Sequence, residues 1–533
     1  MKQTALRQLA RWASGLKLEE IPLRVREQAV NQVLSTLAAV YSGWNSDLGV
    51  PLQRAYSPPA PGPARILPTG VAAPAAHAAL LMASWSMVLD FDDVMLGGHT
   101  GHSSVLVPVA IGSEGGRSGA EMLLAQIVAN EVAARVNMVC AVGSTRGQMA
   151  THLHLMGASA ARAKMEQLDP DRFAEALGFA LAYPARALFP AFLGSDAKAL
   201  CAGLAVRVGM EAIDAVQSGL AAPEDVLDDS RGLFASLSQI PVREFLGGLG
   251  ERWHTETNSF KTYPVCGYLC SALDATIDLV RCHNVSHAEV ASVDVWASLF
   301  TIGMDTHSAP YLDGARSLIS TLTFSTPFTI ASAILAREFS PSQLKRAWIE
   351  DPRVWELAAR VRSHHDVRLT LKALTADIPI GAALRRIRRR EAAAFAWSTA
   401  AAAFGPYGRW RPATLRLMAG LAAAAADGRH LDFSKSTKPI GARVEIRLMD
   451  GRRLCRSVSI PRGFAGSTIS SGRSGIRELV RQKYVEAAGL VISRERAEES
   501  AHLIEDLESL SPIDVGRLID LACLRIQSPA PID

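Results

Sequence analysis

Helical periodicity is sustained over the whole first half of the chain. Apolar residues recur three and four positions apart in EQAVNQVLSTLAAVYSG, in EMLLAQIVANEVAARVNMVCAVG and in DRFAEALGFALAYPARALF, and proline and glycine separate these runs. Each helix with this spacing has one apolar face that must pack against a neighbour. Residues 1–257 are therefore predicted to form an all-helical domain.

The pattern changes after about residue 258. The runs ASVDVWASLF and ARVEIRLMDGRRLCRSVSIPRG alternate apolar and polar residues as strands do, and Asp450-Gly451 is a hairpin signal. Helical runs such as SALDATIDLVRCH and FTIASAILAREF lie between them. We expect a smaller α+β domain over 258–463, and helices over 464–533 that return to the first domain. The predicted fold class is mainly α.

An Arg- and Ala-rich stretch at about 381–430 interrupts the α+β part. Its arginines could bind an anionic partner, a carrier or a membrane surface. The simpler interpretation is a solvated helix face beside an Ala-rich packing helix. The arginines concerned are Arg385, Arg386, Arg388, Arg389 and Arg390.

Composition limits the class of protein. With 533 residues, 49% hydrophobic and 20% charged, the chain can bury a large core in more than one domain. The net charge of +4 is too small to indicate nucleic acid as the main partner. Seven cysteines, mostly far apart, favour a reducing compartment. The N-terminus lacks the apolar core of a secretion signal, and no apolar stretch is long enough to span a bilayer. We expect a cytoplasmic protein with no membrane partner.

The densest cluster of ionisable residues is LDFDDVMLGGHTGHSS, which follows the apolar helical run AALLMASWSMVL. On a helix, Asp90 and Asp93 would share one face and Asp92 would point away, whereas an extended loop beyond the helix end could aim these side chains into a cleft. Together with His99 and His102, the acids could bind a divalent cation or perform acid/base catalysis. The alternative is that the acids cap a helix and pair with nearby arginines.

A second cluster lies in NSFKTYPVCGYLC, where Lys261 precedes Tyr263, Cys266 and Tyr268. A lysine beside an apolar and aromatic turn is well placed to neutralise a substrate carboxylate, although an ordinary surface lysine would also fit.

A third segment, THLHLMGASAARAKM, holds two histidines, His152 and His154. Side chains two residues apart diverge on a helix and lie on opposite faces of an extended segment. One histidine is therefore expected to enter a site while the other packs in the core.

These segments, in this order, resemble the MmgE/PrpD family, which includes 2-methylcitrate dehydratase, cis-aconitate decarboxylase and iminodisuccinate epimerase. The resemblance is carried by LDFDD followed by His102-Ser103-Ser104, by GQMATHLHLMGASAARAKM, by SDAKAL, by the Lys261-Thr262-Tyr263-Pro264 turn, by LTFSTPFTIASAIL and by RVEIRLMDGRRL. The 381–430 stretch lies outside this pattern and is interpreted as an insertion.

The resemblance implies a homodimer whose helical domain carries an α+β lid, with a site between them that needs no metal or other cofactor. Four positions match the family's motif residues: Asp90, His102, Lys198 and Lys261. The other residues expected to contact substrate are Asp93, His99, Tyr263, Cys266 and Tyr268.

The chain also departs from the family pattern. Val94 stands where the family often has Thr, Met87 where it has His, and Ser103 where it has Pro. The decarboxylase branch has His at the place of Cys266 and Tyr at the place of Phe328. These replacements predict a substrate that is bulkier or less charged than a tricarboxylate.

The reaction implied is that of a lyase acting on a small carboxylic acid, with dehydration of a β-hydroxy acid ranked first. Such an elimination needs a base, an acid and cations that stabilise the developing negative charge. In this hypothesis His102 is an acid/base, Asp90 is its partner or the second acid/base, and His152 or His154 is the reserve. Lys198 and Lys261 hold the carboxylate. Decarboxylation and epimerisation in the same pocket are the alternatives.

Three rival interpretations remain. Asp90-Phe91-Asp92-Asp93 matches the D-x-D-D pattern of proton-initiated terpene cyclases, but 6% aromatic residues is few for a carbocation pocket. The same acids with His99 and His102 could hold a metal ion. Finally, the missing motif residues would suit a scaffold that has lost turnover and grips a partner through its arginines.

Overall fold

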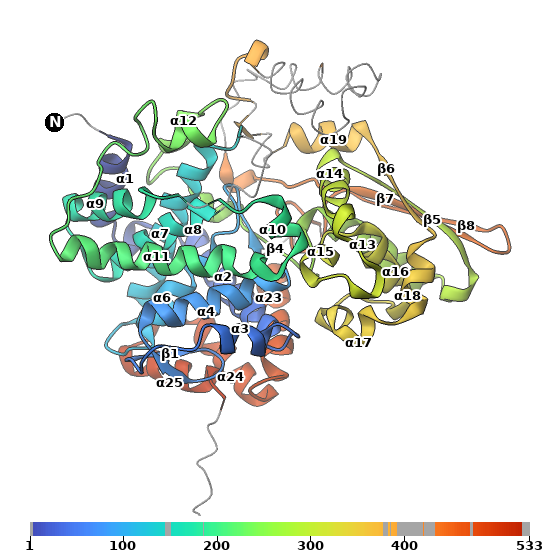
Figure 1. Cartoon of the computed structure of the whole chain (residues 1–533), viewed down its shortest axis with the longest axis horizontal. Helices are drawn as coiled ribbons and strands as arrows, with labels where there is room; N and C mark the ends of the chain where they lie inside the picture. The colour runs from blue at the N-terminus through green and yellow to red at the C-terminus, as the bar shows by residue number, and fades with distance from the viewer. Residues whose placement is uncertain are drawn as a thin grey trace, which may run out of the picture.

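The computed structural model describes residues 4–143, 151–184, 186–376, 382–383, 385–391, 419, 432–468 and 473–524. Over these residues the chain is mainly helical, as predicted, and its strands form two short pairs and one four-stranded sheet. Figure 1 shows a larger helical body beside a smaller one that contains the sheet. Within the described residues, the helices are too short or too polar to cross a membrane.

The larger body is built on long helices that pack side by side. α7 lies against α8, α11 lies against both α8 and α4, and α2 lies against α4. Nearly every position of α4 is buried, because its sequence AAHAALLMASWSMV is apolar on all sides. The helices of this body's first part are α1 (Ala5–Gly15), α2 (Leu23–Trp44), α3 (Gly49–Ala55), α4 (Ala75–Val88), α5 (Gly101–Ser104), α6 (Leu106–Gly112), α7 (Gly119–Val139), α8 (Thr151–Met165), α9 (Pro170–Leu181), α10 (Phe189–Gly194), α11 (Leu200–Gln217) and α12 (Leu233–Leu237).

The last helices of the chain pack on the first ones. α23 (Arg473–Gly489) lies along α2, and α24 (Arg494–Glu505) lies between α23 and α25 (Pro512–Ala522). The Tyr41 ring on α2 meets the Tyr484 ring on α23 edge-on at 5.8 Å, and the Tyr41 hydroxyl donates to the carbonyl of Ala522 at 2.6 Å. Both ends of the chain therefore contribute to one core.

The smaller body contains a sheet with strand order β6-β5-β7-β8. β5 (Val290–Ala297) pairs antiparallel with β7 (Ala442–Leu448) and parallel with β6 (Val361–His365), and β7 pairs with β8 (Arg453–Val458) in the predicted hairpin. Gly451 in its turn has a φ of 90°, which favours glycine. The surrounding helices are α13 (Cys270–Cys282), α14 (Leu299–Ser308), α15 (Ile319–Leu322), α16 (Thr326–Ala336), α17 (Arg346–Ile349), α18 (Pro352–Ala358) and α19 (Val367–Leu374).

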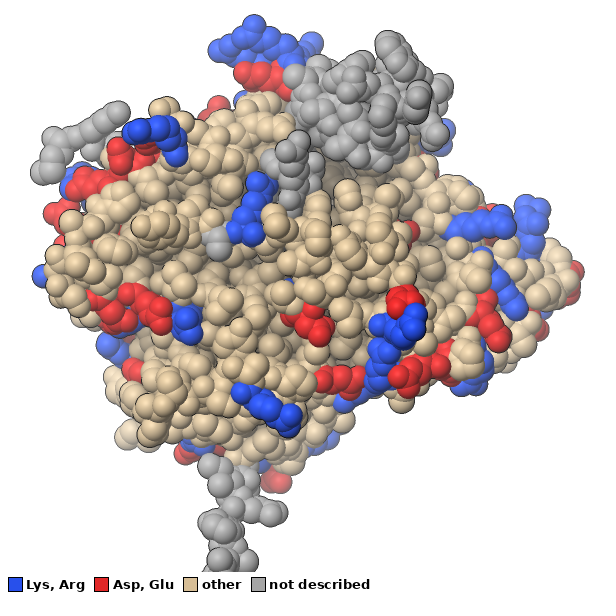
Figure 2. Space-filling view, viewed as in Figure 1, with Lys and Arg blue, Asp and Glu red and all other residues tan. Residues whose placement is uncertain are grey.

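Charged side chains are mostly interspersed by sign on the face shown in Figure 2. Most of the 381–430 stretch lies outside the described residues. Within the described part of it, Arg388, Arg389 and Arg390 are exposed. Arg385 differs from the expected solvated face, because it is buried and donates to the carbonyl of Thr375 at 2.6 Å.

Two short strand pairs complete the described structure. β1 (Ala64–Ile66) pairs with β2 (Val71–Ala73) at the edge of the helical body. β3 (Asp93–Val94) pairs antiparallel with β4 (Ser259–Phe260), which joins the segment after α4 to the segment before Lys261. This second pair brings the two main polar clusters of the sequence together.

Candidate active site

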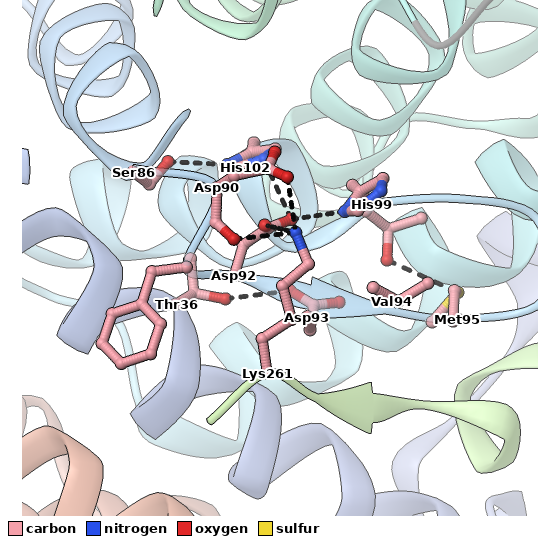
Figure 3. A network of polar contacts seen from close by, with 12 residues as sticks. Thr36, Ser86, Asp90, Asp92, Asp93, Val94, Met95, His99, His102 and Lys261 are labelled. Carbon is pink, nitrogen blue, oxygen red and sulfur yellow. Dashed lines mark hydrogen bonds and ion pairs between the residues drawn. The ribbon is translucent and has the colours of Figure 1, made fainter. Parts of the chain in front are cut away.

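The acidic cluster lies in a turn just beyond the end of α4. Asp90 has a φ of 54°, in the left-handed region that few residues other than glycine adopt, although aspartate tolerates it better than most. Phe91 and Asp92 follow outside any helix or strand, and Asp93 begins β3. The helical arrangement considered for the sequence is therefore wrong: Asp90 and Asp92 point to the same side, and Asp93 points elsewhere (Figure 3).

Two buried lysines neutralise this turn. Lys261 Nζ lies 2.8 Å from Asp92 Oδ1 and 3.3 Å from Asp90 Oδ2. Lys198, in the 3-10 turn η2 (Asp196–Ala199), lies 3.3 Å from Asp90 Oδ1 and donates to Thr323 Oγ1 at 3.4 Å. Burial would raise the pKa of Asp90, but the ammonium groups of Lys198 and Lys261 reverse this effect and lower it. The two lysines therefore keep Asp90 ionised in a dry site.

Two histidines contact the second carboxylate oxygen of Asp92, Oδ2. His99 Nδ1 lies 2.6 Å from Asp92 Oδ2, and His102 Nε2 lies 3.2 Å from the same oxygen. Burial opposes ionisation of Asp92, yet Lys261 and then the two imidazoles hold its pKa well below the usual range. The sequence hypothesis made Asp90 either the partner of His102 or a second acid/base; in the structure the carboxylate beside His102 is that of Asp92.

The other nitrogen of His102 faces Ser86 on α4. The Ser86 hydroxyl lies 2.7 Å from His102 Nδ1 and 2.9 Å from the carbonyl oxygen of Ala83. The hydroxyl has one proton, which it donates either to the carbonyl, so that Nδ1 must carry a proton, or to Nδ1 itself. Ser86 can therefore form a hydrogen bond with His102 Nδ1 whether or not that nitrogen carries a proton. An acid/base group needs both states.

His154 on α8 contacts the cluster. Its ring meets the His102 ring edge-on, with centroids 5.3 Å apart. Both ring nitrogens of His154 are buried without a hydrogen-bond partner among the described residues. Burial, followed by the positive charge of His102, lowers the pKa of His154 well below its ordinary value. His152 is also buried on α8.

Asp93 faces away from the other acids and into the helical body. Its carboxylate accepts from Gln32 Nε2 at 2.8 Å and from Thr36 Oγ1 at 3.3 Å, both on α2. Gly101 packs so closely that any side chain there would overlap this carboxylate. Burial raises the pKa of Asp93, and the charge of Asp92 raises it further. These contacts place Asp93 between α2 and α5.

The residues after Lys261 have different surroundings from one another. The Tyr263 hydroxyl donates to Asp274 Oδ1 on α13 at 2.7 Å, away from the acidic turn. Burial raises the pKa of the Cys266 thiol to about 12, and the nearby charge of Asp90 adds to this. Tyr268 stacks on Phe300, with centroids 5.6 Å apart. Cys266 therefore lies near the cluster, and Tyr263 supports the packing of α13.

Comparison with known proteins identifies the family. The N-terminal domain model of MmgE/PrpD matches residues 7–245, and the C-terminal domain model matches residues 263–394. The chain belongs to the MmgE/PrpD family. Two cis-aconitate decarboxylases from Aspergillus terreus are each 26% identical to it, over 391 and 384 residues. The alignments cover 67% of this chain in both cases, and 78% and 77% of the respective relatives.

The motif positions of the MmgE/PrpD resemblance converge in space. All four lie at one turn, although they are up to 171 positions apart in the chain: Asp90 is in the turn itself, and His102, Lys198 and Lys261 contact it. The C-terminal model match ends at residue 394, inside the stretch interpreted as an insertion. Phe328, where the resemblance predicts a tyrosine in the decarboxylase branch, is buried against Trp355 of α18, with ring centroids 5.6 Å apart.

Sequence reasoning missed Ser86 and Thr323, which hold His102 and Lys198. A lone serine in an apolar helix is not distinctive, although Ser86 lies one helical turn before Asp90. The structure does not favour the metal site considered for these acids, because the ammonium of Lys261 lies between the carboxylates of Asp90 and Asp92. Among the described residues, no three His, Cys, Asp or Glu side chains are grouped as metal ligands.

Proposed function

We propose that this chain is a lyase that acts next to a carboxylate, and that its reaction is the dehydration of a β-hydroxy acid. Membership in the MmgE/PrpD family supports the broader dehydratase- or decarboxylase-like class. The observation that favours dehydration is the pair of adjacent imidazoles, His102 and His154. His102 lies beside a carboxylate, whereas both nitrogens of His154 lack a hydrogen-bond partner among the described residues. Different surroundings of this kind let two similar groups act as acid and base.

In this proposal His154 is the general base. Its ring is neutral because burial disfavours the imidazolium, and both nitrogens are free of partners among the described residues. His102 is the general acid, with the carboxylate of Asp92 3.2 Å from its Nε2 and the Ser86 hydroxyl 2.7 Å from its Nδ1, so both ring nitrogens are held in place. Asp92 thus has the role that the sequence hypothesis gave to Asp90.

The elimination then needs two proton transfers. His154 takes the α-proton, the C–H electron pair forms the new double bond, and the hydroxyl leaves as water with a proton from His102. Lys198 is the cation best placed to hold the substrate carboxylate, because both of its contacts, with Asp90 at 3.3 Å and Thr323 at 3.4 Å, are long, whereas Lys261 also has contacts of 2.8 and 2.9 Å. The Phe324 ring lies 4.7 Å from its Nζ and offers an apolar wall.

We also propose that the elements over 258–463 act as a lid on a helical domain formed by 1–257 and 464–533, in a cytoplasmic homodimer. The packing of α23 on α2 supports this division of the chain. The seven cysteines are all unpaired, which fits a reducing compartment. The dimer rests on the family resemblance.

Decarboxylation is the second candidate, favoured by the two relatives named as cis-aconitate decarboxylases. In that reaction one carboxylate leaves as carbon dioxide, and the electron pair left on carbon takes a proton from His102. It needs only one imidazole, so His154 would have no proton to move. Epimerisation would use both imidazoles on opposite faces of the same carbon.

Mass spectrometry of a panel of hydroxy acids and unsaturated acids, including 2-methylcitrate and cis-aconitate, tests the proposal. Wild-type protein is expected to convert a hydroxy acid with loss of water. His102→Gln and His154→Gln are expected to abolish this conversion, whereas the control His77→Gln retains it, because His77 contacts the carbonyl of Tyr56 instead. Loss of carbon dioxide without loss of water would show that the reaction is a decarboxylation and would overturn the dehydration proposal. No conversion, with only partner binding, would favour a scaffold and overturn the proposal.

A further inference from the structure

The turn from Asp90 to Val94 has an unusual backbone. Asp90 holds a left-handed conformation, and Phe91, Asp92 and Asp93 are buried. A non-glycine residue keeps such a conformation only where its surroundings enforce it. Buried carbonyl groups in the turn also need hydrogen-bond donors.

Lysine side chains supply three of these donors. Lys261 donates from Nζ to the carbonyl of Asp90 at 2.9 Å, and its backbone N–H donates to the carbonyl of Asp92 at 3.3 Å. The carbonyls of Phe91 and Val94 accept from two other lysines, Lys483 and Lys438, which lie outside the cluster described above.

Lys483 reaches the turn from the C-terminal helix α23. Its Nζ donates to the carbonyl of Phe91 at 2.6 Å and to Ser35 Oγ on α2 at 2.8 Å, and it lies 4.0 Å from the centre of the Phe91 ring. The side chain lies on the buried face of α23, beside Val480 and Tyr484. No carboxylate of the described residues lies within ion-pair distance of this ammonium.

Lys438 reaches the other end of the turn from the segment before β7. It is 1% exposed, and its Nζ donates to the carbonyl of Val94. Its backbone N–H donates to the carbonyl of Ala465 at 3.0 Å, whose own N–H donates to Ser259 Oγ on β4. Lys438 is therefore linked by hydrogen bonds to β4, the strand that ends just before Lys261.

Burial of an amine without an ion-pair partner is unfavourable, and a leucine or methionine would fill either position at lower cost. Burial lowers the pKa of both Lys438 and Lys483 to about 7. Two such lysines on the carbonyls of one turn indicate that a donor is required at each.

We propose that Lys438 and Lys483 are positioning residues that hold the Asp90–Val94 turn from two sides. They fix the backbone from which Asp90 and Asp92 meet Lys198, Lys261 and His102, and they touch no reacting atom. Because the two lysines come from the β7 segment and from α23, both bodies of the protein determine the geometry of the site. The kinetic part of this inference rests on the proposed function.

The test uses the full chain with Lys483→Met and Lys438→Met. The matched control is Lys164→Met, since Lys164 donates to the carbonyls of Ala13, Ser14 and Leu16 at the end of α1, far along the chain from the turn. Hydrogen–deuterium exchange of peptides covering 89–96 reports the turn directly. We expect exchange about tenfold faster in both methionine variants, the effect of losing one buried hydrogen bond, and no change in the control. Equal exchange in all three variants would overturn the proposal.

Kinetics on any acid that the wild type converts give the second measurement. We expect kcat to fall about tenfold or more in both variants while KM changes less than about threefold, because the lysines do not contact substrate. Lys483→Arg keeps a donor and is expected to recover most of kcat. A Lys→Gln variant replaces any methionine variant that fails to fold; because glutamine keeps an N–H donor on a shorter side chain, it is expected to change exchange and kcat in the same direction but by less. Faster exchange in a protein that converts nothing would refute the function alone, whereas turnover with an unchanged turn would refute the positioning alone.

Discussion

Replacement of Lys261 by methionine removes the cation shared by the two acids of the site. Lys261 is fully buried, and three oxygens lie around its Nζ: Asp92 Oδ1 at 2.8 Å, the carbonyl of Asp90 at 2.9 Å and Asp90 Oδ2 at 3.3 Å. Methionine has a similar volume but no donor. The variant leaves two buried carboxylates, of which only Asp90 keeps a lysine partner, Lys198.

Removal of one member of a buried ion pair destabilises a protein by about 3–5 kcal/mol. At about 2 °C for each kcal/mol, the melting temperature at pH 7.5 is expected to fall by about 6–10 °C. The control is Lys435→Met, because Lys435 forms an exposed ion pair with Asp432 at 3.0 Å. Exposed pairs contribute at most about 1 kcal/mol, so this variant is expected to melt close to the wild type.

The loss depends on pH in a defined direction. In the wild type the pKa values of Asp90 and Asp92 are lowered, so their ionisation stabilises the fold above the unfolded-state pKa of about 3.9 and this contribution is lost as the pH falls through the folded values. In Lys261→Met, the pKa of Asp92 rises because the largest attraction opposing its burial is gone, and proton uptake relieves the charge that has lost its lysine partner. The difference in melting temperature from the wild type is therefore expected to shrink between pH 7.5 and pH 5.

Differential scanning fluorimetry of a double-mutant cycle measures these effects. Asp92→Asn in the Lys261→Met background removes the carboxylate charge that has lost its lysine partner, and it is expected to restore about 1–3 kcal/mol of coupling. The reasoning is refuted if Lys261→Met melts within about 2 °C of the wild type at pH 7.5, or if Asp92→Asn lowers the melting temperature of that variant further.

Three further outcomes follow from the site. His102→Gln is expected to lower kcat by about 10²–10⁴-fold with the fold intact by circular dichroism, and wild-type turnover would exclude it as the acid. Burial lowers the pKa of His154, so the acid limb of kcat/KM is expected below about pH 6.5; a limb centred above pH 7 would contradict its role as base. Asp93→Asn is expected to lower the melting temperature through its contacts with Gln32 while kcat changes less than about threefold, and a kcat loss as large as that of His102→Gln would return Asp93 to the substrate pocket.

Much of the fold follows from local patterns in the sequence. The helical spacing, the Asp450-Gly451 hairpin and the strand at Val290–Ala297 were all predicted, because each depends on residues close together in the chain. The strand Val361–His365 was not predicted. Its sequence VRSHH has one buried apolar residue, and its conformation comes from parallel pairing with β5.

The sequence predicted which residues form the site better than it predicted which of them contact one another. The motif order pointed to Asp90, His102 and Lys261, but the choice of Asp92 as the histidine partner depends on the left-handed backbone at Asp90, which no periodicity indicates. Lys483 shows what could have been found: it lies three residues after Val480 and one before Tyr484 on an apolar helix face, where a lysine is unexpected.

The central claim is that His154 and His102 move two protons in the elimination of water from a hydroxy acid. The most direct measurement is mass spectrometry of the acid panel in deuterated water, with wild-type protein and His154→Gln compared at equal concentration. We predict loss of water from one hydroxy acid with the wild type, deuterium incorporation at its α-carbon during the reverse reaction, and neither with His154→Gln. Unchanged conversion by His154→Gln, or loss of carbon dioxide without any loss of water, would contradict the claim.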